Sequence, residues 1–114
     1  MHEYSLVQAL VSRVEAAARE KNATRVHRLR VSVGELSGVE PDLFRSAYEV
    51  FRAGTLCEGA DLEIVKVAAR FACPGCGEEL GRGEVLRCAR CDRPARLAPG
   101  SDELLLESVE LEVP

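Results

Sequence analysis

The stretch that decides how this chain folds reads Cys73-Pro-Gly-Cys76, continues through residues 77–87, and ends with Cys88-Ala-Arg-Cys91. Two residues between the cysteines of each pair allow one turn of chain to present both sulfurs to a single metal ion. Two such pairs supply four thiolates, which suit tetrahedral Zn²⁺ with Zn–S bonds of about 2.3 Å. A site closed by four protein ligands has no open position, so we predict a structural rather than a catalytic zinc.

The residues around the two pairs indicate a module, residues 71–100, that depends on metal for its fold. Glycine and proline interrupt periodic structure there and large apolar side chains are few, so metal binding must supply the folding free energy. Gly77 follows the first pair and Asp92 follows the second. Turns of this kind leave the right-handed backbone region after the second cysteine, which glycine does freely and aspartate tolerates. We therefore predict a fixed site of four thiolates: Cys73, Cys76, Cys88 and Cys91.

Outside this module, hydrophobic periodicity predicts two helices. The first is expected over residues 4–21, with Ser5 as its N-cap and Asn22 at its end. Its expected apolar face comprises Leu6, Val7, Leu10, Val11, Val14 and Ala17. Pro41 suits the first turn of a second helix, which Gly54 ends. The expected apolar face of this helix comprises Leu43, Phe44, Ala47, Tyr48 and Phe51.

Three longer strands are expected, over residues 25–34, 61–69 and 104–113. Alternation in the first places Leu29, Val31 and Val33 on one face, and His27 on that same face. Because the cysteine module stands between the last two strands, we expect it to be inserted between strands that pair as neighbours. The predicted fold class is α+β: a small mixed sheet with two helices on one face, plus an inserted zinc-ribbon-like module with four cysteine ligands.

The chain is expected to divide into two units. Residues 1–70, completed by the last strand in residues 101–114, would form an α/β domain, and residues 71–100 would form the zinc module. A total of 114 residues is an ordinary domain size and supports one modest core.

Composition excludes several classes of function. A formal net charge of −4 argues against a general nucleic-acid binder, although five arginines in the cysteine module leave a nucleic-acid-binding zinc ribbon open as an alternative. No apolar run of about 18 residues is present, so no membrane span is expected. The N-terminus lacks the basic and apolar regions of a signal peptide, so we expect a cytoplasmic protein. Cys57 has no basic neighbour and is expected to be an inert, partly buried thiol.

The first residues form a candidate chelator for a second metal. The Met1 amine, the His2 amide nitrogen and the His2 imidazole can close fused five- and six-membered rings on one ion. Deprotonating a peptide amide requires a strongly binding late divalent ion, and Ni²⁺ and Cu²⁺ rank highest for nitrogen ligands. Glu3 adds a nearby carboxylate. A histidine at position two also occurs by chance, so this signal is weak when taken alone.

Several motifs along the chain carry a family resemblance. These are Met1 to Leu6, Val33 to Pro41, Phe44 to Phe51, Gly54-Thr55, Glu58 to Ile64, and the two cysteine pairs. In this order they resemble the HypA family of hydrogenase-maturation nickel metallochaperones over essentially the whole chain. An N-terminal Met-His-Glu combined with two Cys-x-x-Cys pairs is specific, whereas neither feature is specific alone.

The resemblance implies a small α+β nickel-binding domain that carries a zinc lobe. It implies that Ni²⁺ is bound at the N-terminus and inserted into the precursor of the large subunit of nickel–iron hydrogenase, and in some members into urease, with a HypB-type GTPase as partner. The implied nickel ligands are the Met1 amine, His2 and Glu3, together with Glu40. Zn²⁺ would be structural, whereas Ni²⁺ would be transported.

Three functional hypotheses follow from the sequence. The leading one is a non-enzymatic nickel carrier, either a monomer or a weak homodimer. The alternative is a zinc-ribbon adaptor that binds protein or nucleic acid, in which His2 is incidental. An enzyme is not expected, because the sequence offers no Ser/His/Asp or Cys/His constellation. Some relatives carry a histidine beside a cysteine pair; Asp92 stands there in this chain, so we expect no exchange of zinc ligands.

Overall fold

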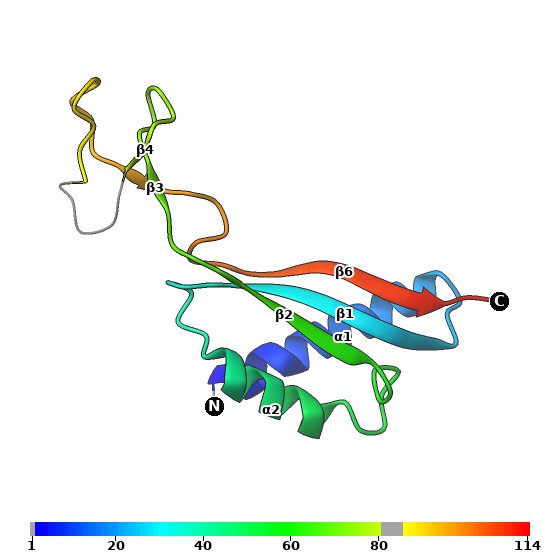
Figure 1. The fold of residues 1–114 in the computed structure, drawn as a ribbon. Helices are drawn as coiled ribbons and strands as arrows, with labels where there is room; N and C mark the ends of the chain where they lie inside the picture. Colours follow the sequence, from blue (N-terminus) through cyan, green and yellow to red (C-terminus); the bar gives the residue numbers. More distant parts are fainter. Residues whose placement is uncertain (1, 81–85) are drawn as a thin grey trace.

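The computed structural model describes residues 2–80 and 86–114, with the side chain of residue 2 excepted (Figure 1). The longer elements are α1 (His2–Glu20), β1 (Arg25–Gly34), α2 (Pro41–Phe51), β2 (Asp61–Val67) and β6 (Leu104–Glu112). Between β2 and β6 lie three short strands: β3 (Phe71–Ala72), β4 (Glu79–Leu80) and β5 (Arg96–Leu97). No helix in these ranges is long and apolar enough to cross a bilayer.

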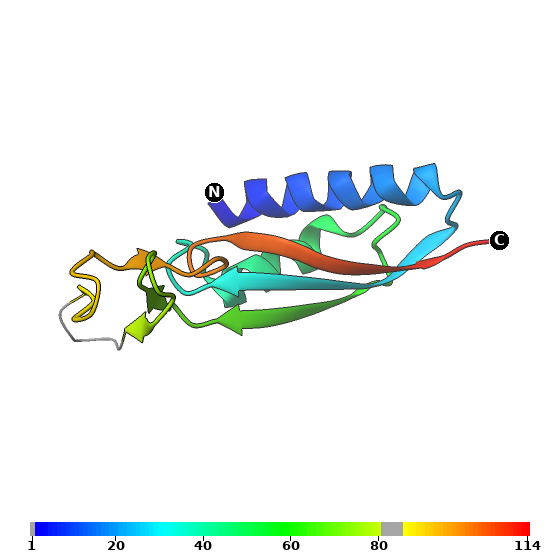
Figure 2. The same ribbon diagram turned by 90° about the horizontal axis from the view of Figure 1, so that it is seen from above.

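The larger sheet is mixed, and both long helices cover the same face of it (Figures 1 and 2). Its strand order is β2-β1-β6; β1 pairs with β2 in parallel and with β6 antiparallel. This arrangement confirms the predicted α+β class. The expectation that β2 and β6 pair as neighbours is wrong, because the chain returns through α2 to place β2 parallel to β1. β6 then takes the other edge of β1, so β1 separates the two strands that flank the cysteine module.

Helix α1 buries one apolar face and ends in a hydrogen-bonded cap. The buried residues are Val7, Val11, Val14 and Ala18, so Ala18 replaces Ala17 on the expected face. The N–H of Ala23 bonds to the carbonyl of Ala18, and Asn22 adopts a φ of 55°, as expected for the residue that ends the helix. Ser5 is not the N-cap, because the helix already begins at His2.

Strand β1 has the predicted limits but contains an irregularity that changes the side on which His27 lies. The pairing with β6 shifts register between Val26 and Arg28. Val26 is therefore buried, and the exposed His27 ring lies 3.2 Å (Nε2 to Oε1) from the Glu112 carboxylate. The expectation that His27 shares the face of Leu29 is wrong, because a bulge interrupts strict alternation.

Helix α2 supplies the aromatic part of the core. Glu40 is its N-cap and Pro41 its first residue. Phe44 and Tyr48 are buried against the sheet, whereas Leu43, expected on the apolar face, is 53% exposed. The helix ends at Phe51, before Gly54. Cys57, in the following loop, is fully buried, and burial raises its pKa to about 11, which fits the expected inert thiol.

The short strands form a second sheet, β4-β3-β5, in a lobe that extends from one end of the larger sheet (Figure 2). The molecule is correspondingly elongated, with extents of 55 × 29 × 17 Å. Close contacts near Gly34 and Glu35 hold the segments that lead into and out of the lobe against the end of the larger sheet. The N–H of Ala69 bonds to the Glu35 carboxylate at 2.8 Å, and the backbone at Gly34 packs so closely against the carbonyl oxygen of Gly100 that a Cβ there would clash with it.

Candidate metal centre

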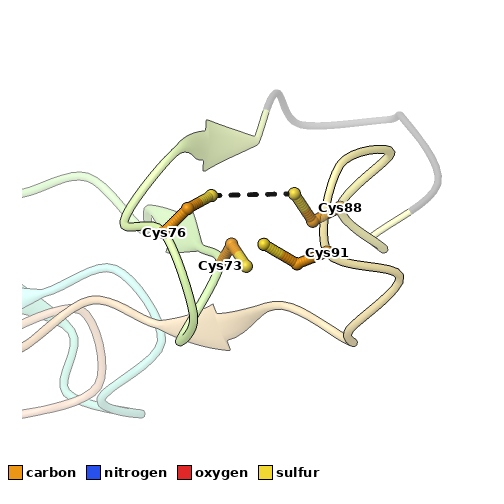
Figure 3. Close-up of side chains that lie close together, drawn as sticks. All are labelled: Cys73, Cys76, Cys88 and Cys91. Carbon is orange, nitrogen blue, oxygen red and sulfur yellow. Dashed lines mark hydrogen bonds between the residues drawn. The ribbon is translucent and has the colours of Figure 1, made fainter.

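Four cysteine side chains converge at the centre of the small lobe (Figure 3). The sulfurs of Cys73, Cys76, Cys88 and Cys91 all lie within 4.8 Å of one another. Two of the four, Cys73 and Cys88, are buried, and Cys76 is exposed. The turn after β3 and the loop before β5 each contribute one pair, so sulfurs from two separate segments meet at one point.

Both turns have the same backbone arrangement, which explains how each pair is positioned. The N–H of Gly77 donates to the carbonyl of Cys73 at 2.8 Å. The N–H of Asp92 donates in the same way to the carbonyl of Cys88 at 2.9 Å. Gly77 and Asp92 have φ angles of 76° and 50°, which confirms the left-handed conformation predicted at both positions.

The chemistry of this donor set fits a thiophilic cation. A hydrogen bond from the Cys76 backbone lowers the pKa of Cys73 to about 7. Hydrogen bonding with the sulfurs of Cys76 and Cys73, with burial and charge repulsion, raises the pKa of Cys91 to about 12. The Cys73 thiol therefore ionises readily, whereas the Cys91 thiol resists ionisation. A bound divalent cation would hold all four cysteines as thiolates. Tetrahedral Zn²⁺ matches the number and the type of these ligands.

Charged side chains surround the cysteine cluster. The guanidinium of Arg87 lies 2.8 Å from the Asp92 carboxylate, and the side chain of Arg93 lies close to Gly75. Arginines at these positions can offset the net negative charge of four thiolates on a divalent ion. Arg82, another arginine of the cysteine module, lies outside the described residues.

The structure describes only some of the nickel ligands that the family resemblance implies. Met1 lies outside the described residues, and His2 opens α1. Glu3 is only 9% exposed, and its carboxylate accepts the backbone N–H of Glu40 at 3.4 Å. The Glu40 carboxylate in turn accepts the N–H of Leu43 at 2.9 Å and caps α2. The structure therefore brings Glu3 and Glu40 together where the first turns of two helices meet.

The sequence alone could not predict that the first turns of α1 and α2 lie in contact. Glu3 and Glu40 are 37 positions apart, and no local pattern joins them. Figures 1 and 2 show the start of α1 away from the cysteine lobe, and the contact between Glu3 and Glu40 places it beside the start of α2. The two groups of candidate ligands therefore occupy separate regions of the molecule.

Comparison with known proteins shows which family the chain resembles in sequence. Residues 1–111 match the family model described as "Hydrogenase/urease nickel incorporation, metallochaperone, hypA". The hydrogenase maturation factor HypA of Aquifex aeolicus is 39% identical over 114 residues, covering 99% of each chain. The protein of the same name from Wolinella succinogenes is 40% identical and covers 98% of this chain and 96% of its own.

Solved structures agree with the sequence comparison. The solution structure of the Ni metallochaperone HypA from Helicobacter pylori superposes with a TM-score of 0.72 at 29% identity, covering 98% of both chains. A second solution structure, of a HypA protein, gives a TM-score of 0.79 at 31% identity and covers 97% of this chain and 96% of its own. These names describe metallochaperones and maturation factors rather than enzymes. The chain belongs to the HypA family of nickel metallochaperones for hydrogenase maturation.

Proposed function

We propose that this protein binds Ni²⁺ at its N-terminus and delivers it to the precursor of the nickel–iron hydrogenase large subunit, with urease as a second client. The observation that carries the proposal is that α1 begins at His2 and that Glu3, in its first turn, lies beside Glu40. Delivery would take place in the cytoplasm, with a HypB-type GTPase as partner. The match of residues 1–111 to a nickel-incorporation family supports this assignment.

A chelate at this position is chemically reasonable. The Met1 amine, the His2 amide nitrogen and the His2 imidazole would supply three nitrogen donors. The first amides of a helix have no acceptor within the helix, so metal binding at the His2 amide breaks no helical hydrogen bond. All three nitrogens must be deprotonated to bind, so protons compete with the metal and assist its release.

Glu3 and Glu40 would complete the nickel site. One carboxylate oxygen of each accepts a backbone N–H, and an ionised carboxylate has further acceptor positions for an ion. The positive ends of two helix dipoles meet here, which is unfavourable for a cation. The two negative charges counter that effect, and the balance suits a site that must hold nickel and also release it.

We further propose that Cys73, Cys76, Cys88 and Cys91 hold a structural Zn²⁺ that organises the small lobe. The support is the convergence of four sulfurs within 4.8 Å of one another. Zinc with four protein ligands has no open coordination position, so its role would be in folding rather than in nickel transfer.

The proposal is tested by nickel titration combined with metal analysis. The His2→Ala variant should lose nickel binding and keep its zinc content and fold. A variant with one residue added before Met1 keeps every side chain but displaces the amine, and it should also bind nickel more weakly. Unchanged nickel affinity in this second variant would contradict the N-terminal site and favour a zinc-ribbon adaptor.

A further inference from the structure

Strand β6 forms one outer edge of the larger sheet, and no strand in the described residues pairs with its outer side (Figure 1). The carbonyl of Glu103 accepts the N–H of Gly34 at 2.8 Å, so the backbone at Glu103 faces β1. Along an antiparallel strand, the backbone groups of successive residues point alternately to one side and to the other. The N–H and carbonyl groups of Leu104 and Leu106 therefore point away from β1, towards the free edge.

The opposite edge of the sheet, formed by β2, is partly covered by side chains of α2. The guanidinium of Arg45 donates to the carbonyl of Leu62 in β2 at 2.8 Å. Arg52 donates to the carbonyl of Ala60, just before β2, at 3.0 Å. By contrast, no side chain in the described ranges hydrogen-bonds to the backbone of residues 104–111. The edge of β6 is therefore the one that is open to another strand.

An apolar groove, here called the edge groove, lies between β6 and α1. Its volume is about 160 Å³, and Arg13 is the only charged residue in its lining. The other lining residues are Leu6, Ala9, Leu10, Val31, Leu104 and Leu106. Residues directly opposed on two paired strands have their side chains on the same face of the sheet. A strand paired with Leu104 and Leu106 would therefore direct its own alternate side chains towards the edge groove.

The side of β6 that faces away from the helices is acidic. Side chains alternate along a strand, so Glu103 and Leu105 lie on the face opposite to Leu104. Leu105 is 40% exposed. Three glutamates, Glu103, Glu107 and Glu110, are exposed and form no ion pair with any residue that the structure describes. A strand paired with β6 would therefore meet apolar side chains on the helix side and carboxylates on the other side.

These carboxylates disfavour a second copy of this chain as the occupant of the edge. Two β6 strands paired edge to edge would bring the glutamates of one copy beside those of the other. Like charges opposed across two strands are destabilising. Charged side chains commonly prevent edge strands from pairing with themselves, and the same charges favour a partner of opposite sign. The edge of β6 therefore suits a basic strand.

We propose that the free edge of β6 binds an extended segment of another protein by strand addition. The segment forms main-chain hydrogen bonds with the outward groups of Leu104 and Leu106. Its alternate apolar side chains occupy the edge groove, and Lys or Arg side chains at the intervening positions pair with Glu103 and Glu107. The inference does not depend on nickel or zinc binding, because all the residues that carry it lie outside the cysteine lobe.

The probe for this site is a synthetic peptide, Lys-Val-Thr-Val-Lys-Val-Lys, blocked at both ends. In a strand its valines lie on one face and its lysines and threonine on the other. It is titrated into isotope-labelled, full-length, zinc-loaded protein and followed by amide NMR. We expect saturable binding of one peptide per chain, with shifts at Leu104, Leu106 and the α1 residues of the edge groove. No saturable binding up to about 1 mM peptide overturns the proposal.

Modified peptides test the binding mode. N-methylation of the valines removes the donors aimed at β6 and should abolish binding, whereas N-methylation of the threonine, whose N–H points away from β6, should leave the affinity unchanged. A peptide with glutamate in place of every lysine should bind at least about tenfold more weakly. Undiminished binding of the peptide with methylated valines overturns strand addition, and equal binding of the glutamate peptide overturns the preference for a basic segment.

Charge reversal in the protein gives the reciprocal test. The double variant E103K/E107K should bind the lysine peptide at least about tenfold more weakly and should gain affinity for the glutamate peptide. E20K reverses an exposed charge at the end of α1 and is the matched control, with wild-type affinity for both peptides. A purely structural effect would not exchange the two preferences, and unchanged preferences in the double variant overturn the proposal.

Protein concentration separates this partner from a second copy. Without peptide, the amide signals of Leu104 and Leu106 should stay in place as the protein is concentrated. Shifts of these two signals with protein concentration would show that a second copy occupies the edge, and would overturn the proposal.

Discussion

Tyr48 is the residue that joins α2 to the chain entering β2. Its side chain is 1% exposed, and its hydroxyl donates to the carbonyl oxygen of Ala60 at 2.9 Å. Burial is the main cause that raises its pKa from 10.0 to about 12. The folded state therefore favours the neutral phenol, and its contribution to stability should be present below pH 10 and lost as the pH rises towards 12.

Replacing Tyr48 by Phe tests this contribution. The Ala60 carbonyl keeps a hydrogen bond from Arg52 at 3.0 Å, so the variant should lose only about 1 kcal/mol of unfolding free energy at pH 7. Urea unfolding at several pH values measures the difference from wild type. That difference should shrink between pH 10 and pH 12, and a constant difference would contradict a buried neutral phenol.

Single residues with special backbone angles were the most predictable part of the molecule. Asn22, Gly77 and Asp92 all have positive φ, and each was identified from its position after a helix or a cysteine pair. Such positions are set by local steric rules. The contact between Glu3 and Glu40 depends instead on how two helices pack, and no local rule contains that information.

At the scale of an element, Gly77 controls the first cysteine turn. Its φ of 76° is costly for residues with a side chain, by about 1–2 kcal/mol. Gly77→Ala should therefore weaken zinc retention about 5- to 30-fold, as measured by competition with a chelator. Gly59→Ala is the matched control, because an added Cβ there meets open space and its φ is not in the left-handed region. Equal zinc retention in both variants would show that the turn does not require this conformation.

The strands show what hydrophobic periodicity can predict and what it cannot. The limits of β1 were predicted because alternating Leu and Val mark them clearly. The bulge near His27 was missed because an extra residue leaves no mark on the sequence pattern. The pairing of β2 with β1, rather than with β6, was missed because periodicity reports which face of a strand is buried and not which strand lies beside it.

At the scale of the whole molecule, the two lobes should respond differently to zinc removal. The larger sheet and its helices share a continuous apolar core that includes no cysteine of the metal cluster. The small lobe has only two-residue strands around its sulfurs. Stripping zinc should unfold residues 71–100 and leave the core of the larger lobe intact.

Amide NMR spectra with and without a zinc chelator measure this effect residue by residue. Signals from residues 71–100 should collapse to random-coil positions, whereas those of α1 and β1 should stay dispersed. Nickel should still bind the stripped protein. Loss of dispersion throughout the spectrum would mean that the chain folds as one cooperative unit.

The order of strands in the larger sheet also bears on how the protein is made. β1 lies between β2 and β6, and β6 is the last element of the sequence. On the ribosome, the cysteine segment therefore leaves the exit tunnel before one side of the central strand has its neighbour. We expect a nascent chain that has already captured zinc to hold Ser101 near Leu36, a contact of 2.9 Å in the finished protein, and so to start β6 in its proper register.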